Sequence, residues 1–192
     1  MDMPTNKILL TGAAGWLGSR LLEQIVNGIR GGTQEMLGAT AIRCMIQPQQ
    51  QLYPFRVEGQ LIQVQEGDLR SKSFCAHFCE GFKDGVLIHT AGVIHPRYVH
   101  DFYSVNMQGT ENLLRAAVAA GVRRFVAVSS NSPCGCNPRR DHRFTEESPY
   151  NPYMNYGRSK MLMEQVIQSF GTRGAIETVI VRAPWFYGPG QP

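Results

Sequence analysis

The chain alternates short apolar runs with stretches of helical periodicity, and this alternation constrains its fold more than any other feature. Stretches typical of short strands lie at residues 7–12, 41–46, 85–92, 124–130 and 177–183, and residues 61–69 contain another. Helical spacing of apolar residues is found at residues 16–29, 106–120 and 157–169. Strands that alternate with helices favour parallel pairing, because each crossover returns the chain to the same end of the sheet. We therefore predict an α/β fold with a doubly wound parallel sheet and helices on both faces.

Length and composition favour one globular domain that spans residues 1–192. The chain has 192 residues, of which 43% are hydrophobic, and this is enough for a sizeable core. The glycine-rich residues 28–38 and the polar residues 47–60 are expected to be loops at the edge of the sheet. The sequence ends in the apolar, Gly/Pro-rich "WFYGPGQP". Since such a loop normally leads to another element, we expect that a C-terminal substrate region is missing.

Charge and cysteine content argue against several function classes. The net charge is +4, but Lys and Arg are scattered without a basic stripe, so a nucleic-acid partner is not expected. The N-terminus lacks a signal-peptide pattern, and no apolar run approaches the ~18 residues that span a bilayer, so we expect a cytoplasmic protein without membrane association. The five cysteines are expected to be reduced thiols. Neither Cys75/Cys79 nor Cys134/Cys136 has a second ligand pair at a zinc-like distance, so no metal site is predicted.

The segment "TGAAGWLG" follows the first apolar run and opens the first helix. It places Gly12, Gly15 and Gly18 at three-residue intervals, in contrast to the G-x-G-x-x-G spacing of the usual dinucleotide fingerprint. Glycine permits a tight turn and a close approach of a pyrophosphate, and the helix N-terminus offers unpaired N–H groups. The segment predicts a dinucleotide-binding turn. The alternative is a glycine-rich turn that binds nothing.

A second candidate site is the pair Tyr156 and Lys160 in "NYGRSK". Residues four apart lie on the same face of a helix, so this spacing brings the phenol and the ammonium together. A free tyrosine has a pKa of about 10 and is a poor base at neutral pH, whereas a neighbouring cation favours the phenolate. Such a pair suits proton transfer at a carbonyl oxygen. The spacing also occurs by chance on solvated helices, so the upstream motifs must decide.

Several motifs occur together in the order of a known family. They are "TGAAGWLG" (11–18), "GDL" (67–69), "HTAG" (89–92), "VSSNSPCG" (128–135), "YGRSK" (156–160) and "VRAPWFYGPG" (181–190). In this order the chain resembles the extended short-chain dehydrogenases/reductases, which include NAD-dependent sugar epimerases and dehydratases and 3β-hydroxysteroid dehydrogenases. The resemblance implies a Rossmann-type fold and hydride transfer with NAD or NADP.

The resemblance also implies roles for individual residues. The catalytic group would be Ser130, Tyr156 and Lys160. Pro133-Cys134 replace the usual Val-Tyr of the serine motif, so Ser129 and Ser132 remain alternatives to Ser130. The cofactor-binding residues would be Gly12, Gly15, Trp16, Leu17, Gly18, Asp68, Leu69, Thr90, Ala91, Gly92, Asn106, Ser129, Tyr156, Lys160 and Pro184. In this set Asp68 would accept from the adenine amino group, and Asn106 would begin a helix and support the active site.

The choice of cofactor depends on the end of the second apolar run. An acidic residue there would bind the adenosine 2′-hydroxyl of NAD, but the position is Ile46 or Gln47, with no Asp or Glu between Glu35 and Glu58. An arginine would favour NADP, and the nearest, Arg43, lies inside the run. Neither signal is present. The missing acid tips the preference slightly toward NADP.

Three functions are compatible with these patterns. The first is an epimerase or dehydratase that acts on a nucleotide sugar, and the second is a dehydrogenase or reductase of a steroid-like or alicyclic alcohol or ketone. The third is a non-catalytic dinucleotide sensor, which the presence of Tyr156 and Lys160 disfavours. The resemblance further suggests a small-molecule substrate and a homodimer built from the helices at 106–120 and 157–169.

Other aromatic and histidine residues near these motifs are less informative. His89 is expected to be a packed residue, while His95 and His100 flank a loop on the substrate side. Residues 185–187 (Trp-Phe-Tyr) would either wall the substrate pocket or pack against a C-terminal region.

Overall fold

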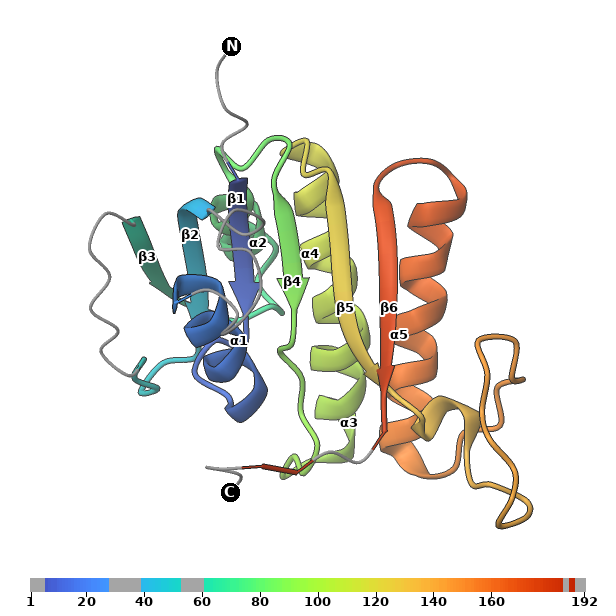
Figure 1. Cartoon of the computed structure of the whole chain (residues 1–192). Helices are drawn as coiled ribbons and strands as arrows, with labels where there is room; N and C mark the ends of the chain where they lie inside the picture. Colours follow the sequence, from blue (N-terminus) through green and yellow to red (C-terminus); the bar gives the residue numbers. More distant parts are fainter. Residues whose placement is uncertain (1–5, 28–38, 53–60, 185–186, 189–192) are drawn as a thin grey trace.

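The computed structural model describes residues 6–27, 39–52, 61–184 and 187–188, which form a six-stranded sheet with helices on both faces (Figure 1). The strands are β1 (Asn6–Thr11), β2 (Ala39–Ile46), β3 (Leu61–Glu66), β4 (Val86–His89), β5 (Arg124–Ser130) and β6 (Glu177–Ala183). All neighbouring strands pair in parallel, in the order β3-β2-β1-β4-β5-β6. The order reverses between β1 and β4, so the predicted doubly wound parallel sheet is confirmed.

The helices cover the two faces of the sheet unequally. They are α1 (Trp16–Asn27), α2 (Lys72–Cys79), α3 (Val99–Asp101), the π-helix η1 (Phe102–Gly109), α4 (Thr110–Ala119), the 3₁₀ helix η2 (Ser132–Cys134) and α5 (Met154–Thr172). Figure 1 shows α1 in front of the sheet and α2, α4 and α5 behind it. The strands run toward the bottom of that view, so their carboxyl ends meet at one edge.

The core is divided into two layers by the central strand β1. Successive side chains of a strand point to opposite faces, and β1 has neighbours on both. Leu9 therefore packs in the layer that also holds Phe78 of α2, whereas Leu10 packs with Leu22 of α1 and Ile42 of β2. These side chains are at most 1% exposed. Each contributes about 1.5–3 kcal/mol of burial free energy.

Two helix predictions differ from the structure. The helix α2 was not predicted, because its eight residues are too few for a clear apolar period; it is fixed instead by Ser71, which caps its first turn, and by buried Phe78. The helix predicted at 106–120 begins earlier, so Asn106 does not start it. Asn106 lies inside η1, where π-helical geometry precedes α4.

Candidate active site

The turn between β1 and α1 requires glycine at two positions for structural reasons. Gly12 has a φ of +73°, and a Cβ there would lie 2.7 Å from the Ala91 nitrogen. A Cβ on Gly18 would overlap the carbonyl oxygen of Gly12. A Cβ on Gly15 would meet only that same oxygen, at 3.2 Å. Gly12 and Gly18 are therefore needed by the turn itself, whereas a Cβ at Gly15 would make a single tight contact, and Gly15 lines the pocket described next.

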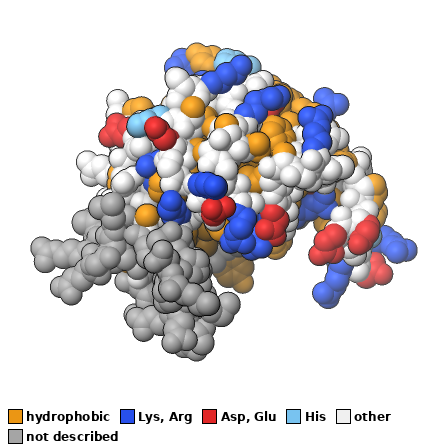
Figure 2. Space-filling view, turned by 90° about the horizontal axis from the view of Figure 1, so that it is seen from above, with side chains coloured by type: hydrophobic (Ala, Val, Ile, Leu, Met, Phe, Trp, Pro, Cys, Tyr) orange, Lys and Arg blue, Asp and Glu red, His pale blue; other side chains and the backbone are white. Residues whose placement is uncertain are grey.

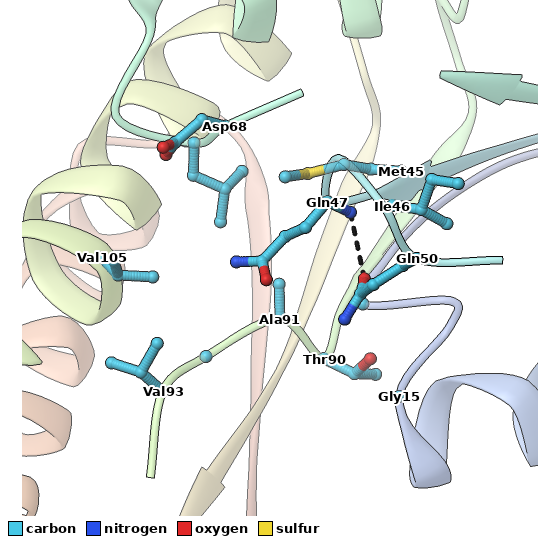
Figure 3. Close-up of a pocket in the computed structure, with 13 residues that line it drawn as sticks. Gly15, Met45, Ile46, Gln47, Gln50, Asp68, Thr90, Ala91, Val93 and Val105 are labelled. Atoms are coloured by element: carbon cyan, nitrogen blue, oxygen red, sulfur yellow. Dashed lines mark hydrogen bonds between the residues drawn. The ribbon is translucent and has the colours of Figure 1, made fainter. Parts of the chain in front are cut away.

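A pocket lies at the carboxyl ends of β1, β2 and β4, where the strand order reverses (Figure 3). Open parallel sheets bind ligands at such a point. The predicted cofactor residues that line it are Gly12, Gly15, Asp68, Leu69, Thr90, Ala91 and Gly92. Further lining residues that the motifs did not indicate are Met45, Gln50, Val93 and Val105. Their apolar or amide character carries no distinctive signal in the sequence.

Other predicted cofactor residues do not line this pocket. Trp16 and Leu17 begin α1, and Gly18 packs on the turn. Pro184 follows β6 and is exposed. Asn106 and Ser129 are buried with partners elsewhere, as described below.

The pocket has one charged lining residue among the described residues. This is Asp68, whose carboxylate accepts hydrogen bonds from the Arg70 backbone N–H (2.9 Å) and from Arg70 Nε (2.8 Å). These bonds hold the pKa of Asp68 below its usual range. The side chain of Gln47 extends into the pocket between Asp68 and Ala91, and its backbone N–H donates to Gln50 Oε1 (Figure 3).

Arg43 points away from this pocket. Its Nη1 donates to the carbonyl oxygens of Phe78 and Glu80, both at 2.8 Å, at the end of α2. Its guanidinium also lies over the Phe82 ring, 4.4 Å from the centroid. Arg43 is thus occupied in holding α2 to β2.

Ser130 and Tyr156 meet at the carboxyl end of β5. Ser130 Oγ accepts from the Ser132 N–H at 3.1 Å and lies 3.0 Å from Ser132 Oγ. Burial raises the pKa of Tyr156, and a hydrogen bond with Ser130 opposes this rise. The pKa is therefore shifted in the direction opposite to the one expected from a neighbouring lysine.

Lys160 lies one helical turn from Tyr156 but directs its ammonium toward β5. Its Nζ donates to the Val128 carbonyl (2.9 Å) and to Met163 Sδ (3.3 Å). A buried ammonium needs acceptors, and the strand carbonyl supplies one. Burial lowers the pKa of Lys160 to about 8, and the charge of Glu164 opposes this change. The predicted contact between Lys160 and Tyr156 is thus replaced by one between Lys160 and β5.

The alternation of β5 separates its two terminal serines. Ser129 is 4% exposed, and its hydroxyl donates to Glu164 Oε1 of α5 at 2.5 Å. Ser130 points to the other side, toward Tyr156 and Ser132. Of the serines weighed from the sequence, Ser129 therefore faces the helix, and only Ser130 and Ser132 lie together near the phenol.

Asn106 joins the loop after β4 to α5. It is 1% exposed; its Oδ1 accepts from the Val93 N–H (2.8 Å), and its Nδ2 donates to the Val93 carbonyl (3.1 Å) and to Ser159 Oγ (3.0 Å). The amide therefore shapes the pocket wall at Val93 from behind, without lining the pocket itself.

His89 is a packed residue, as predicted, and it bridges two threonines. Its Nδ1 lies 2.7 Å from Thr11 Oγ1, and its Nε2 lies 2.9 Å from Thr110 Oγ1. Thr110 donates its proton to the Asn106 carbonyl, so it must accept from Nε2–H, and Nδ1 must accept from Thr11. Burial lowers the pKa of His89 to about 3, which keeps the ring neutral.

Outside the pocket, the described surface adds little to the site. Figure 2 views the amino ends of the strands and shows Lys and Arg side chains scattered there among acidic ones. In the described part of the chain, no helix is long and apolar enough to cross a membrane. Neither His95 nor His100 lines the pocket, and Tyr187 is exposed. The predictions for Trp185 and Phe186 lie outside the described residues.

Comparison with known proteins agrees with this arrangement. The sequence profile of the NAD dependent epimerase/dehydratase family matches residues 8–192. The chain is 48% identical, over 186 residues, to the uncharacterized protein y4nL of Sinorhizobium fredii, covering 96% of this chain and 52% of that protein. It is 32% identical to a uronate dehydrogenase of Pseudomonas putida, covering 93% and 60%.

A solved structure is similar over the same region. DesIV, a dTDP-glucose 4,6-dehydratase of Streptomyces venezuelae crystallised with NAD and TYD, superposes with a TM-score of 0.85 at 27% identity. The match covers 96% of this chain and 57% of DesIV. The chain belongs to the NAD dependent epimerase/dehydratase family. It spans about half the length of the curated relatives it matches.

Proposed function

We propose that this chain carries the cofactor-binding and proton-transfer parts of an NAD-dependent oxidoreductase, of the epimerase or dehydratase type, that acts on a nucleotide sugar. One observation carries the proposal. The glycine turn after β1 and the Ser130–Tyr156 pair after β5 lie at the same carboxyl edge of one sheet. Similar proteins have been crystallised with NAD, among them DesIV with NAD and TYD and MoeE5 with NAD and UDP-glucose.

The proton-transfer roles follow from the chemistry of the side chains. The Tyr156 hydroxyl would exchange a proton with the substrate oxygen, and the Ser130 hydroxyl would donate a hydrogen bond to that oxygen as charge develops. The Lys160 ammonium donates to the Val128 carbonyl, so it would favour the phenolate form of Tyr156 through its charge, from one helical turn away, and not through a hydrogen bond. A bound nicotinamide supplies the hydride acceptor or donor for the carbon that carries this oxygen.

The residues present fit an adenine dinucleotide. Gly15 leaves space beside the α1 N-terminus for a pyrophosphate, and Asp68 would accept from the adenine amino group. The Gln47 amide would pair with the ribose 2′-hydroxyl. Because Arg43 is bound to α2, the described pocket has no cation for a 2′-phosphate. We therefore propose NAD, and not the NADP that the missing acid alone favours.

A second candidate is the oxidation of a free sugar acid. It is favoured by the uronate dehydrogenase, which is more similar in sequence to this chain (32% identity) than DesIV is (27%). No described residue favours a steroid-like substrate specifically, and that alternative stays a prediction. Substrate trials should accordingly include dTDP-glucose, UDP-glucose and glucuronate.

The test combines cofactor titration with one conservative variant. Titration with NADH, followed by nicotinamide fluorescence and calorimetry, should give a dissociation constant at least about ten-fold lower than that for NADPH. Tyr156→Phe should leave this constant unchanged and lower kcat by about 10²–10⁴-fold, because it removes only the transferable proton.

Two results would contradict the proposal. Absence of binding of both NADH and NADPH would refute the assignment of the glycine turn as a cofactor site. Full turnover by Tyr156→Phe would remove Tyr156 from the mechanism. Tyr153→Phe serves as the matched control, because it makes the same deletion at a tyrosine that is 57% exposed and should reduce kcat far less.

A further inference from the structure

A buried ionic cluster lies directly behind the proposed catalytic group. Glu164, on α5, has a side chain with 0% exposure. Its Oε2 accepts from Arg182 Nη2 (2.9 Å) and Nε (3.1 Å) of β6 and from the Tyr150 hydroxyl (2.8 Å). Its Oε1 accepts from Ser129 (2.5 Å). One carboxylate thus joins a helix, the ends of two strands and the segment before α5.

The position of this carboxylate connects it to the proposed site. Glu164 follows Lys160 by one helical turn on the same face of α5, and both are buried. Ser129 precedes Ser130 on β5. The remaining partners of Lys160, the Val128 carbonyl and Met163, are uncharged. Among the described residues, Glu164 is the acidic group that interacts with the buried ammonium.

We propose that Glu164 is a positioning residue for the Ser130–Tyr156–Lys160 group, supplying the counter-charge of the Lys160 ammonium and fixing the ends of β5 and β6 to α5. The inference rests on the proposed function of that group. Without Glu164, the Lys160 ammonium, which is 5% exposed, would be buried without a counter-charge, and the Arg182 guanidinium, which is 20% exposed, would lose its carboxylate partner. With Glu164 the cluster carries a net charge of +1, and formation of the Tyr156 phenolate would bring it to zero.

The electrostatic surroundings give the expected direction of change. The charge of Glu164 opposes the effect of burial on the Lys160 pKa, so the loss of this charge should lower that pKa further below about 8. The other titratable or charged side chains that interact within the cluster are Tyr150, Arg182, Cys134 of η2, Tyr156 and His89 of β4. His89 is neutral because it is buried, and the Arg182 guanidinium is bound to Glu164 itself.

The test measures the titration of Lys160 directly, so it needs neither cofactor nor substrate. The protein is labelled with ¹³Cε-lysine, and Lys160→Arg identifies the resonance. Glu164→Gln, which keeps the shape and removes the charge, should lower the Lys160 midpoint by about one pH unit, a ten-fold change in its protonation ratio. Ser129→Ala, which removes one hydrogen bond to Glu164 but no charge, should leave the midpoint in place.

If Glu164→Gln does not fold, the double variant Glu164→Gln/Arg182→Gln replaces it in the test. The second substitution removes the Arg182 guanidinium, which would otherwise be left without its carboxylate partner. The Lys160 midpoint of the double variant should also fall below the wild-type value. An unchanged midpoint in a folded Glu164→Gln or double variant would overturn the inference, since a purely structural carboxylate would not move it. In turnover assays the alkaline limb of kcat should shift to lower pH in the same variants. Tyr156→Phe decides the proposed function separately.

Discussion

The two parts of the proposed site are built differently. The turn after β1 is shaped by its own backbone: Gly12 takes a left-handed φ against Ala91, and Gly18 packs on the Gly12 carbonyl. The end of β5 is held instead by side chains from distant segments, with Glu164 joining Ser129, Tyr150 and Arg182. A site that binds an anion needs free N–H groups and space, whereas a site that moves protons needs charges held in fixed positions.

The first prediction tests whether the turn after β1 binds a ligand, and it has the largest expected effect. Gly15→Val should reduce NADH affinity by at least about 100-fold, or ~2.7 kcal/mol, because its side chain would occupy the space of the pyrophosphate. It should lower the free energy of unfolding less than Gly12→Ala does, since a Cβ at Gly15 makes one tight contact, 3.2 Å from the Gly12 oxygen, whereas a Cβ at Gly12 would lie within 3.0 Å of three atoms. Calorimetry and urea denaturation measure the two quantities.

Gly12→Ala is the matched control for this turn. A Cβ at Gly12 would lie 2.7 Å from the Ala91 nitrogen in a backbone conformation that favours glycine, so this variant should lose both stability and binding. If Gly15→Val destabilises the protein as much as Gly12→Ala does, then Gly15 is a structural residue like its neighbours, and the turn gives no evidence for a ligand.

This difference between the two regions explains what could be predicted from the sequence. The geometry of the glycine turn depends on eight consecutive residues, so a local motif could predict it. Gly12 and Gly15 of this turn line the pocket as predicted, and so does Asp68 from the separate motif after β3. The six strands were also predictable, because each contains several apolar residues within a short stretch, although polar residues interrupt β3. The helix α2 was missed since its eight residues hold too few periods, and the start of the helix at Asn106 was wrong because π-helical geometry has no clear sequence signal.

The cluster around Glu164 could not be predicted from local patterns. Glu164 and Arg182 are separated by 18 residues and lie on different elements, and neither belongs to a short motif. One partial indication of Glu164 was present in the sequence: it follows Lys160 by four residues, as Lys160 follows Tyr156, so the three side chains share a face of α5. The direction of the Lys160 side chain depends on an acceptor on β5, so no helical spacing could reveal it.

The second prediction concerns His89 of β4, which joins Thr11 at the end of β1 to Thr110 of α4. The pKa of His89 is lowered to about 3 in the folded protein, against about 6.5 in an unfolded chain. Between these values the unfolded chain binds a proton that the folded protein does not. Stability from this residue is therefore complete above pH 6.5 and is lost as the pH falls toward 3.

His89→Gln separates this effect from that of the carboxylates. The variant should be less stable than the wild type by about 1–3 kcal/mol at pH 7, because one buried threonine loses its partner. The difference should shrink at lower pH by up to about 1.4 kcal/mol per unit, since glutamine does not titrate. Urea denaturation from pH 7 to pH 4.5 measures it. A difference that is constant with pH would show that His89 does not carry this linkage.

The third prediction concerns Gln47 and Arg43 near the end of β2, and its expected effect is the smallest of the three. Gln47→Arg places a cation where the Gln47 amide extends into the pocket, and it should improve NADPH affinity relative to NADH by about ten-fold, or ~1.4 kcal/mol. Arg43→Met should leave that ratio unchanged, because the guanidinium is bound to the carbonyls of α2. It should instead lower the free energy of unfolding by about 1–3 kcal/mol.

A change in the cofactor ratio caused by Arg43→Met would show that Arg43 reaches the ribose despite its contacts with α2. That result would return the preference to NADP. The opposite result has two parts: Gln47→Arg changes the affinity ratio of NADPH to NADH, and Arg43→Met changes only the free energy of unfolding. It would show that Gln47 selects the cofactor and that Arg43 stabilises the fold. Arg43 and Gln47 are four residues apart, a spacing that strand alternation would place on the same face of the sheet. Their different roles therefore depend on the end of β2, where Gln47 leaves the sheet and Arg43 remains in it.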